Sequence, residues 1–215
     1  MKRINRSLAA ASLLGLIGLT LFSQTSLGFF SHLDTADLLK PGEYQLGAEP
    51  QIIFNNYSGL NVIGHLDMGA TDSSNYRFVL GTGSTVFQAG GFFKFVPIPD
   101  YANQPGIGGY AGLLYAYQNG ISVLSLRVHP EISKKLNSDR AGLFTPYVAL
   151  PFGISFYNGN TLYPFQIALG TKWLPSQFRH LNFWTELGLN LNSAFSYLSL
   201  GLTVPFDSWN DIRFN

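Results

Sequence analysis

The most constraining feature of this sequence is a two-residue alternation of apolar and polar side chains over most of residues 43–206. In the segment LSLRVHPEIS, residues 124–133, the apolar residues share one parity, and Arg127, His129 and Glu131 share the other. An extended strand places alternate side chains on opposite faces. The chain is therefore predicted to be almost wholly β, with one apolar and one polar face on every strand.

Ten segments show this alternation, and clusters of turn-forming residues such as NNYSG, TDSS and YNGN separate them. Their lengths match the roughly 9–11 residues that a tilted strand needs to cross a bilayer. We predict ten strands, although eight or twelve are compatible with the same pattern. The segments are 43–54, 60–71, 75–83, 85–95, 107–118, 124–133, 144–156, 163–173, 180–192 and 197–206.

Two kinds of barrel would show such alternation: a soluble one with an apolar interior, and a membrane one with an apolar exterior. Charged residues make up only 12% of the chain, against about 25% in soluble domains. The apolar face carries no charge, and its aromatic residues gather toward the strand ends, as lipid interfaces favour. In lipid every backbone group must be paired. We therefore predict an all-β fold, a closed antiparallel transmembrane β-barrel over residues 43–206.

The N-terminus is typical of a secretory signal peptide. Lys2, Arg3 and Arg6 precede an uncharged apolar run over residues 8–22, and small residues follow it. That run is short for a spanning helix, which needs about 20 residues, so a cleaved signal is preferred over a membrane anchor. We predict a signal peptide over residues 1–28, with cleavage after Thr25 as the alternative.

Two segments flank the predicted barrel. Residues 29–42 are expected to form a short periplasmic segment, in which Thr35 could cap a short helix that Pro41 and Gly42 would end. Residues 207–215 are expected to be a C-terminal tail.

Composition excludes several kinds of protein. The 13 basic and 12 acidic residues do not indicate a nucleic-acid partner. No cysteine is present, so disulfides, cysteine zinc sites and a cysteine nucleophile are all excluded. A metal site from His65, Asp67 and His129 would need two strands to meet that are not neighbours. No metal and no cofactor are therefore expected.

The last predicted strand carries a more specific motif. In SLGLTVPF, residues 199–206, polar Ser199 is followed by Gly201, Val204 and the aromatic Phe206. This spacing resembles the C-terminal assembly signal of Gram-negative outer-membrane β-barrel proteins, except that a tail follows the aromatic residue. The resemblance implies an outer-membrane location, contact with outer-membrane lipid, and periplasmic chaperones and the barrel-assembly machinery as partners during biogenesis. It leaves the oligomeric state open.

The polar faces would line the lumen. Their charged and histidine residues can either pair and hold a narrow barrel shut, or line a conduit for small solutes. Both readings are kept: a structural barrel or a small-solute pore. The predicted network is Glu43, Glu49, His65, Asp67, Arg77, Lys94, Arg127, His129, Glu131, Lys172 and Glu186, with His180 on the same face.

An outer-membrane enzyme that hydrolyses lipid or peptide is the alternative of a different class. His65 and Asp67 share one face, and His129 lies near Ser125 and Ser133, which are the ingredients of a hydrolase. The same spacing arises on any strand and no catalytic motif is recognisable, so no catalytic residue is assigned. Adhesion is disfavoured because the predicted external loops are short.

Overall fold

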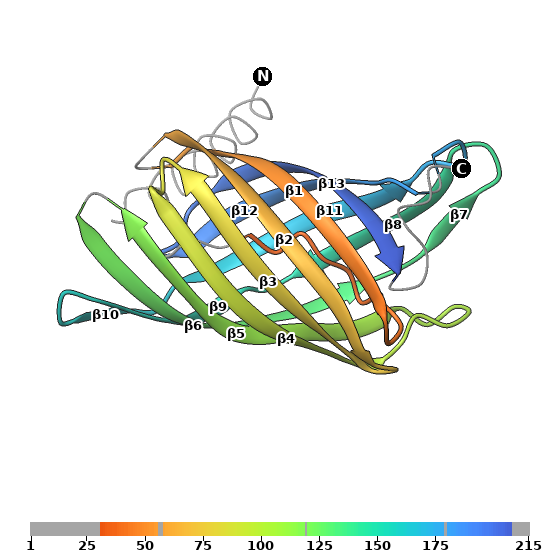
Figure 1. The fold of residues 1–215 in the computed structure, drawn as a ribbon, viewed down its shortest axis with the longest axis horizontal. Coiled ribbons are helices and arrows are strands. Elements are labelled where there is room, and N and C mark those ends of the chain that lie inside the picture. Colours follow the sequence, from red (N-terminus) through yellow and green to blue (C-terminus); the bar gives the residue numbers. More distant parts are fainter. Residues whose placement is uncertain (1–30, 56–57, 119, 179, 208–215) are drawn as a thin grey trace, which may run out of the picture.

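The computed structural model describes residues 31–207 apart from 56, 57, 119 and 179, and it is a closed antiparallel β-barrel (Figure 1). The predicted signal peptide and residues 208–215 of the predicted tail lie outside the described residues. The strands are β1 (Glu43–Ile53), β2 (Gly59–Thr71), β3 (Ser74–Gly83), β4 (Phe87–Ile98), β5 (Gly106–Gln118), β6 (Ile121–Ser133), β7 (Leu136–Ser138), β8 (Gly142–Ala149), β9 (Phe152–Tyr157), β10 (Asn160–Leu162), β11 (Phe165–Leu174), β12 (Asn182–Asn192) and β13 (Tyr197–Asp207).

These elements make ten barrel strands, as predicted. β8 and β9 are two parts of one strand, since both pair with β6 and both pair with β11. Pro151 interrupts that strand and Pro164 separates β10 from β11, because proline has no N–H for the ladder. β7 pairs only with β8 and forms a short ribbon. The first and last strands pair over their length, with Tyr44 opposite Phe206, so the barrel closes.

The wall has the polarity that was predicted from the alternation. Leu126 on β6 is 48% exposed, whereas the next residue, Arg127, is 2% exposed. The same opposition runs along the other strands, where the exposed positions are mostly apolar and the buried ones are mostly polar. A barrel that is apolar outside and polar inside is suited to lipid.

The outward aromatic residues lie at both ends of the strands, as expected for interfacial girdles. At one rim Phe144 stacks on Trp173 with 5.8 Å between ring centroids, and Tyr44 stacks on Phe206 at 5.4 Å. At the other rim Phe87 contacts Tyr115 at 6.4 Å.

The two barrel ends differ. The terminal end holds the start of β1, the end of β13 and the connections that follow β2, β4, β6 and β11; the far end holds the connections that follow β1, β3, β5, β9 and β12 (Figure 1). Lys134 links two connections of the terminal end, donating to Asp100 at 2.5 Å and to the carbonyl of Gln104 at 3.0 Å. At the far end, the turn after β12 folds inward and buries Phe195.

The segment before β1 corrects one prediction. Residues 31–42 contain no helix. Instead they run inside the barrel toward the terminal end, seen as the red-orange trace behind β2 and β3 in Figure 1. The physical reason lies in the amide groups of His32, Leu33 and Ala36, which bond to side chains of the barrel wall and not to carbonyls of their own segment. Thr35 is fully buried rather than capping a helix.

Candidate functional site: a lumen filled by the N-terminal segment

Residues 31–40 fill the terminal-end half of the lumen and are called the plug segment below. His32, Leu33, Asp34, Thr35 and Ala36 are all buried, and exposure increases toward Lys40 at the mouth. Contacts to this segment come from strands all around the barrel, from β1 to β13. The plug segment therefore lies on the barrel axis and not against one wall.

Glu186 on β12 forms the most densely bonded contact. Its carboxylate accepts the amide of His32 at 2.9 Å and the amide of Leu33 at 2.6 Å. The hydroxyls of Tyr147 and Tyr197 donate to the same group at 2.6 and 2.5 Å. Four donors on one buried carboxylate satisfy both oxygens, which is what a buried charge requires.

His32 is fixed through its ring and its carbonyl. Its Nε2 lies 2.6 Å from Oε2 of Glu131, and its ring stacks on Tyr110 with 5.1 Å between centroids. Its carbonyl accepts from the Tyr110 hydroxyl at 2.8 Å and from Nη1 of Arg77 at 2.9 Å. With Glu186 on β12, four strands thus hold this one plug residue.

Asp34 provides a buried anion between two wall cations. Lys94 Nζ donates to it at 2.9 Å, and Arg77 Nη2 lies 3.6 Å away. Burial by itself raises the pKa of Asp34, but the positive charges of Arg77 and Lys94 outweigh burial and lower that pKa to about 2. Lys94 also donates to the carbonyls of Thr35 and Asp37, so one side chain binds three points of the plug segment.

Asp37 makes the outermost ionic contact. Its two carboxylate oxygens bind Lys172 Nζ at 3.0 Å and Lys135 Nζ at 2.7 Å. Burial raises the pKa of this carboxyl, and the two lysines overcome burial and hold the pKa well below its usual range. Asp37 is therefore ionised at any physiological pH.

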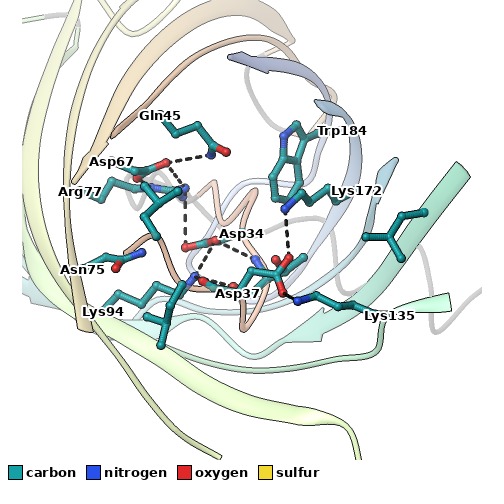
Figure 2. Close-up of a pocket in the computed structure, with 14 residues that line it drawn as sticks. Asp34, Asp37, Gln45, Asp67, Asn75, Arg77, Lys94, Lys135, Lys172 and Trp184 are labelled. Atoms are coloured by element: carbon teal, nitrogen blue, oxygen red, sulfur yellow. Dashed lines mark hydrogen bonds and ion pairs between the residues drawn. The ribbon is translucent and has the colours of Figure 1, made fainter. Parts of the chain in front are cut away.

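A cavity of about 260 Å³ lies beside these groups at the terminal end. Figure 2 shows Gln45, Asp67 and Arg77 on one side of it and Trp184 with Lys172 on the other, with Asp34 and Asp37 between them. The Lys172 ammonium lies 5.6 Å from the centre of the Trp184 ring, within cation–π range.

The far half of the lumen is nearly solid. The cavity that Glu49, His65 and Arg127 help to line holds only about 30 Å³, on the scale of one or two water molecules. Glu49 accepts the Ser31 hydroxyl at 2.6 Å. Gly47 leaves the room that the His65 ring occupies, because a Cβ there would lie 1.7 Å from His65 Nε2.

The turn after β12 closes the far end. Phe195 is buried in a cluster with Ile53, Ile63 and Tyr197. Its carbonyl accepts from Nε2 of Gln166 at 2.5 Å. Asn55, which follows the neighbouring strand β1, fixes the same turn by donating to the carbonyl of Ala194 at 3.2 Å and accepting from the amide of Ser196 at 2.7 Å. The turn after β12 thus packs into the far end of the lumen, while the plug segment occupies the terminal-end half.

The predicted network is brought together, but mostly through the plug segment. Two pairs join predicted charged residues directly: Arg77 binds Asp67 at 2.5 Å, and Lys94 lies 3.9 Å from Glu131. Glu43 lies at the rim and accepts the amide of Lys40 at 2.8 Å. Arg127 and His129 are buried, and His180 lies in the turn before β12.

The sequence reasoning missed the acids of the plug segment and the lumen tyrosines. Asp34 and Asp37 belong to no strand, so the two-residue alternation that identifies lumen positions on a strand does not apply to them. The polar faces of the predicted strands carry five acids and four bases, so nothing in the sequence indicated that further acids would enter the lumen. Tyr110 donates to the carbonyl of His32, and Tyr147 and Tyr197 donate to Glu186; none of the three is among the predicted network residues.

The serine residues considered for a hydrolase make hydrogen bonds to other groups. Ser125 and Ser155 share a hydrogen bond of 2.8 Å, and Ser133 accepts the amide of Ala36 at 3.0 Å. Among the described residues no group of three metal-ligating side chains is found. In that same part of the chain no helix is long and apolar enough to cross a membrane.

Comparisons with known proteins identify no family for this chain. No protein-family model and no curated protein matches the sequence. The chain is similar to a de novo designed transmembrane β-barrel, with 13% identity, coverage of 79% of this chain and 100% of that one, and a TM-score of 0.40. The β domain of the Bordetella autotransporter BrkA is 10% identical, with coverage of 77% of this chain and 99% of that one and a TM-score of 0.47. The N-terminal barrel domain of Pseudomonas aeruginosa OprF is 11% identical, with coverage of 78% of this chain and 100% of that one and a TM-score of 0.31. At this level of similarity none of them indicates a function for this chain.

Proposed function

We propose that the protein is a structural β-barrel of the bacterial outer membrane that is closed in its resting state and passes no solute. The observation that supports this most directly is the plug segment on the barrel axis, with Glu186 holding its backbone and Lys94 holding Asp34. The buried turn around Phe195 adds a second closure in series at the other end.

A small-solute pore that opens when the plug segment leaves is the second candidate. It is supported by the nature of the plug contacts, which are hydrogen bonds and ion pairs to a polar wall. Such contacts exchange with water more readily than a packed apolar core does. The polar wall that remains would then suit small polar solutes.

Conductance across a planar bilayer tests both proposals. We expect the wild type, a variant lacking residues 31–40, and a variant with Phe195→Gly to be silent, because each keeps at least one closure. The combined variant should show a stable ohmic conductance. Heat-modifiability on gels checks that each variant has folded.

A wild-type protein that conducts steadily would contradict the closed barrel and support the pore. Conductance from the variant lacking residues 31–40 alone would mean that the plug segment is the only gate. A folded combined variant that stays silent would contradict the pore.

Location and assembly belong to the same proposal. The signal peptide over residues 1–28 would direct the chain to the periplasm. The barrel-assembly machinery would then recognise β13 and insert the chain into the outer membrane; the recognised residues are Ser199, Gly201, Val204 and Phe206. Gly201 and Phe206 lie on opposite faces of that strand. Membrane fractionation checks this, and we expect Phe206→Ala to lower the folded yield more than Phe54→Ala at the other rim.

A further inference from the structure

The terminal-end cavity contains a carboxylate position built from two lysines. Lys172 on β11 and Lys135 in the connection after β6 each bind one oxygen of Asp37, at 3.0 and 2.7 Å. Their side chains are 15% and 45% exposed, and that of Asp37 is 19% exposed. Water, and with it a dissolved anion, therefore reaches this position from the mouth of the barrel.

The charge of the cavity is divided unevenly between the barrel and the plug segment. Apart from the plug segment, the lining supplies four cations and a single acid, Asp67. The plug segment supplies the other two acids, Asp34 and Asp37. The four cations are Arg77, Lys94, Lys135 and Lys172. The barrel by itself thus presents a basic vestibule, and the plug segment satisfies it with carboxylates.

Two further features favour a ligand in the free volume. Thr35 is fully buried and lines the cavity, and its hydroxyl oxygen has no hydrogen-bond partner among the described residues. The Trp184 ring forms an apolar wall beside Lys172. A short carbon chain can pack on such a ring while its charged end meets the lysines.

We propose that this cavity binds a small water-soluble carboxylate, which takes the place of Asp37 between Lys135 and Lys172. The proposed ligand is a carboxylate because the group now bound there is one, with one lysine on each oxygen. A volume of about 260 Å³ suits a solute of a few carbon atoms rather than a drug-sized molecule. Asp37 acts in this scheme as a competing internal ligand.

Titration calorimetry on the full-length folded protein in detergent tests the site, with succinate as the probe and uncharged succinamide as its control. Asp37→Asn removes the internal competitor and should tighten succinate binding about tenfold. Adding Lys172→Gln to that variant should weaken binding about tenfold, as should Lys135→Gln. Succinamide should not bind measurably.

Lys134→Gln is the matched control in the Asp37→Asn background. Lys134 neighbours Lys135, but it binds Asp100 and two carbonyls instead of lining the cavity. We expect unchanged succinate affinity. An equal loss from Lys134→Gln and Lys135→Gln, binding of succinamide, or no succinate binding to Asp37→Asn would each overturn the proposal. Inorganic phosphate binding more tightly than succinate would overturn the carboxylate assignment.

The site and the closed barrel can fail separately. Calorimetry needs no bilayer, so a protein that conducts and also binds succinate would contradict the closed barrel and leave the site intact. A protein that neither conducts nor binds succinate would contradict the carboxylate site and leave the closed barrel intact.

Discussion

Glu186 accepts a hydrogen bond from the amide of His32, a residue 154 positions earlier in the chain, at 2.9 Å. No strand pairing joins these residues. The contact exists because the barrel closes around a segment that is not part of its wall, and it makes that segment part of the folded core.

Replacing Glu186 by Gln should destabilise the folded barrel. The Gln side chain would turn an N–H₂ group toward two donors that now meet a carboxylate oxygen, and the loss of charged hydrogen bonds should cost about 2–3 kcal/mol. Urea unfolding of the refolded protein in detergent measures this. Asp139→Asn, in the exposed turn between β7 and β8, is the control and should change the free energy of unfolding by less than about 0.5 kcal/mol. Equal effects would mean that Glu186 does not anchor the plug segment.

The two faces of β6 should respond differently to charge. Leu126→Arg puts a cation on the lipid face, which costs about 2–4 kcal/mol near the bilayer midplane. Arg127→Leu removes a charge from the buried lumen face and leaves the lipid face unchanged. We expect a sharp fall in the yield of heat-modifiable protein in the membrane fraction for the first variant and a milder one for the second. The reverse order would show that this wall does not face lipid.

The contribution of Asp34 should depend on pH in one direction. Its pKa is lowered from 3.8 to about 2 in the folded protein by Arg77, Lys94 and His32, despite burial. An acid whose pKa is lower in the folded than in the unfolded protein stabilises the folded state at pH values above its unfolded pKa. The contribution of Asp34, about 2 kcal/mol, is therefore fully present above pH 3.8 and is lost as the pH falls toward 2. The difference in unfolding free energy between wild type and Asp34→Asn should therefore shrink over that interval. A difference that is constant from pH 5 to pH 2 would contradict the ionic contact.

Two glycines of β2 offer a test of the space that the plug segment needs. A Cβ on Gly69 would lie 1.9 Å from the carbonyl oxygen of Lys40, where the plug segment leaves the lumen. A Cβ on Gly64 meets nothing closer than 3.8 Å. Gly69→Ala should destabilise by about 1–3 kcal/mol through overpacking, whereas Gly64→Ala should be nearly neutral. Urea midpoints compare the two directly, and equal midpoints would show that the plug segment does not need its present path.

The sequence by itself determined the wall of this protein. Side chains alternate with a period of two on any strand, so the apolar parity of Leu126 and the polar parity of Arg127 identified the lipid face and the lumen face before any contact was known. The scarcity of charges and the aromatic strand ends indicated lipid, and lipid requires closure. The ten strands, their turns and the membership of Glu186, Lys94 and Lys172 in the lumen followed from local pattern alone.

Only the tertiary structure decided what fills the lumen. Residues 31–40 have no periodicity that pairs them with a strand, and their amides bond to side chains that lie far away in sequence, such as Glu186 and Ser133. Lys94 lies 2.9 Å from Asp34 and 3.9 Å from Glu131 because the closed wall brings all three groups together. A local pattern specifies which face a residue occupies, whereas long-range contacts inside a barrel are fixed only once the sheet has closed, because closure sets the distances across the lumen.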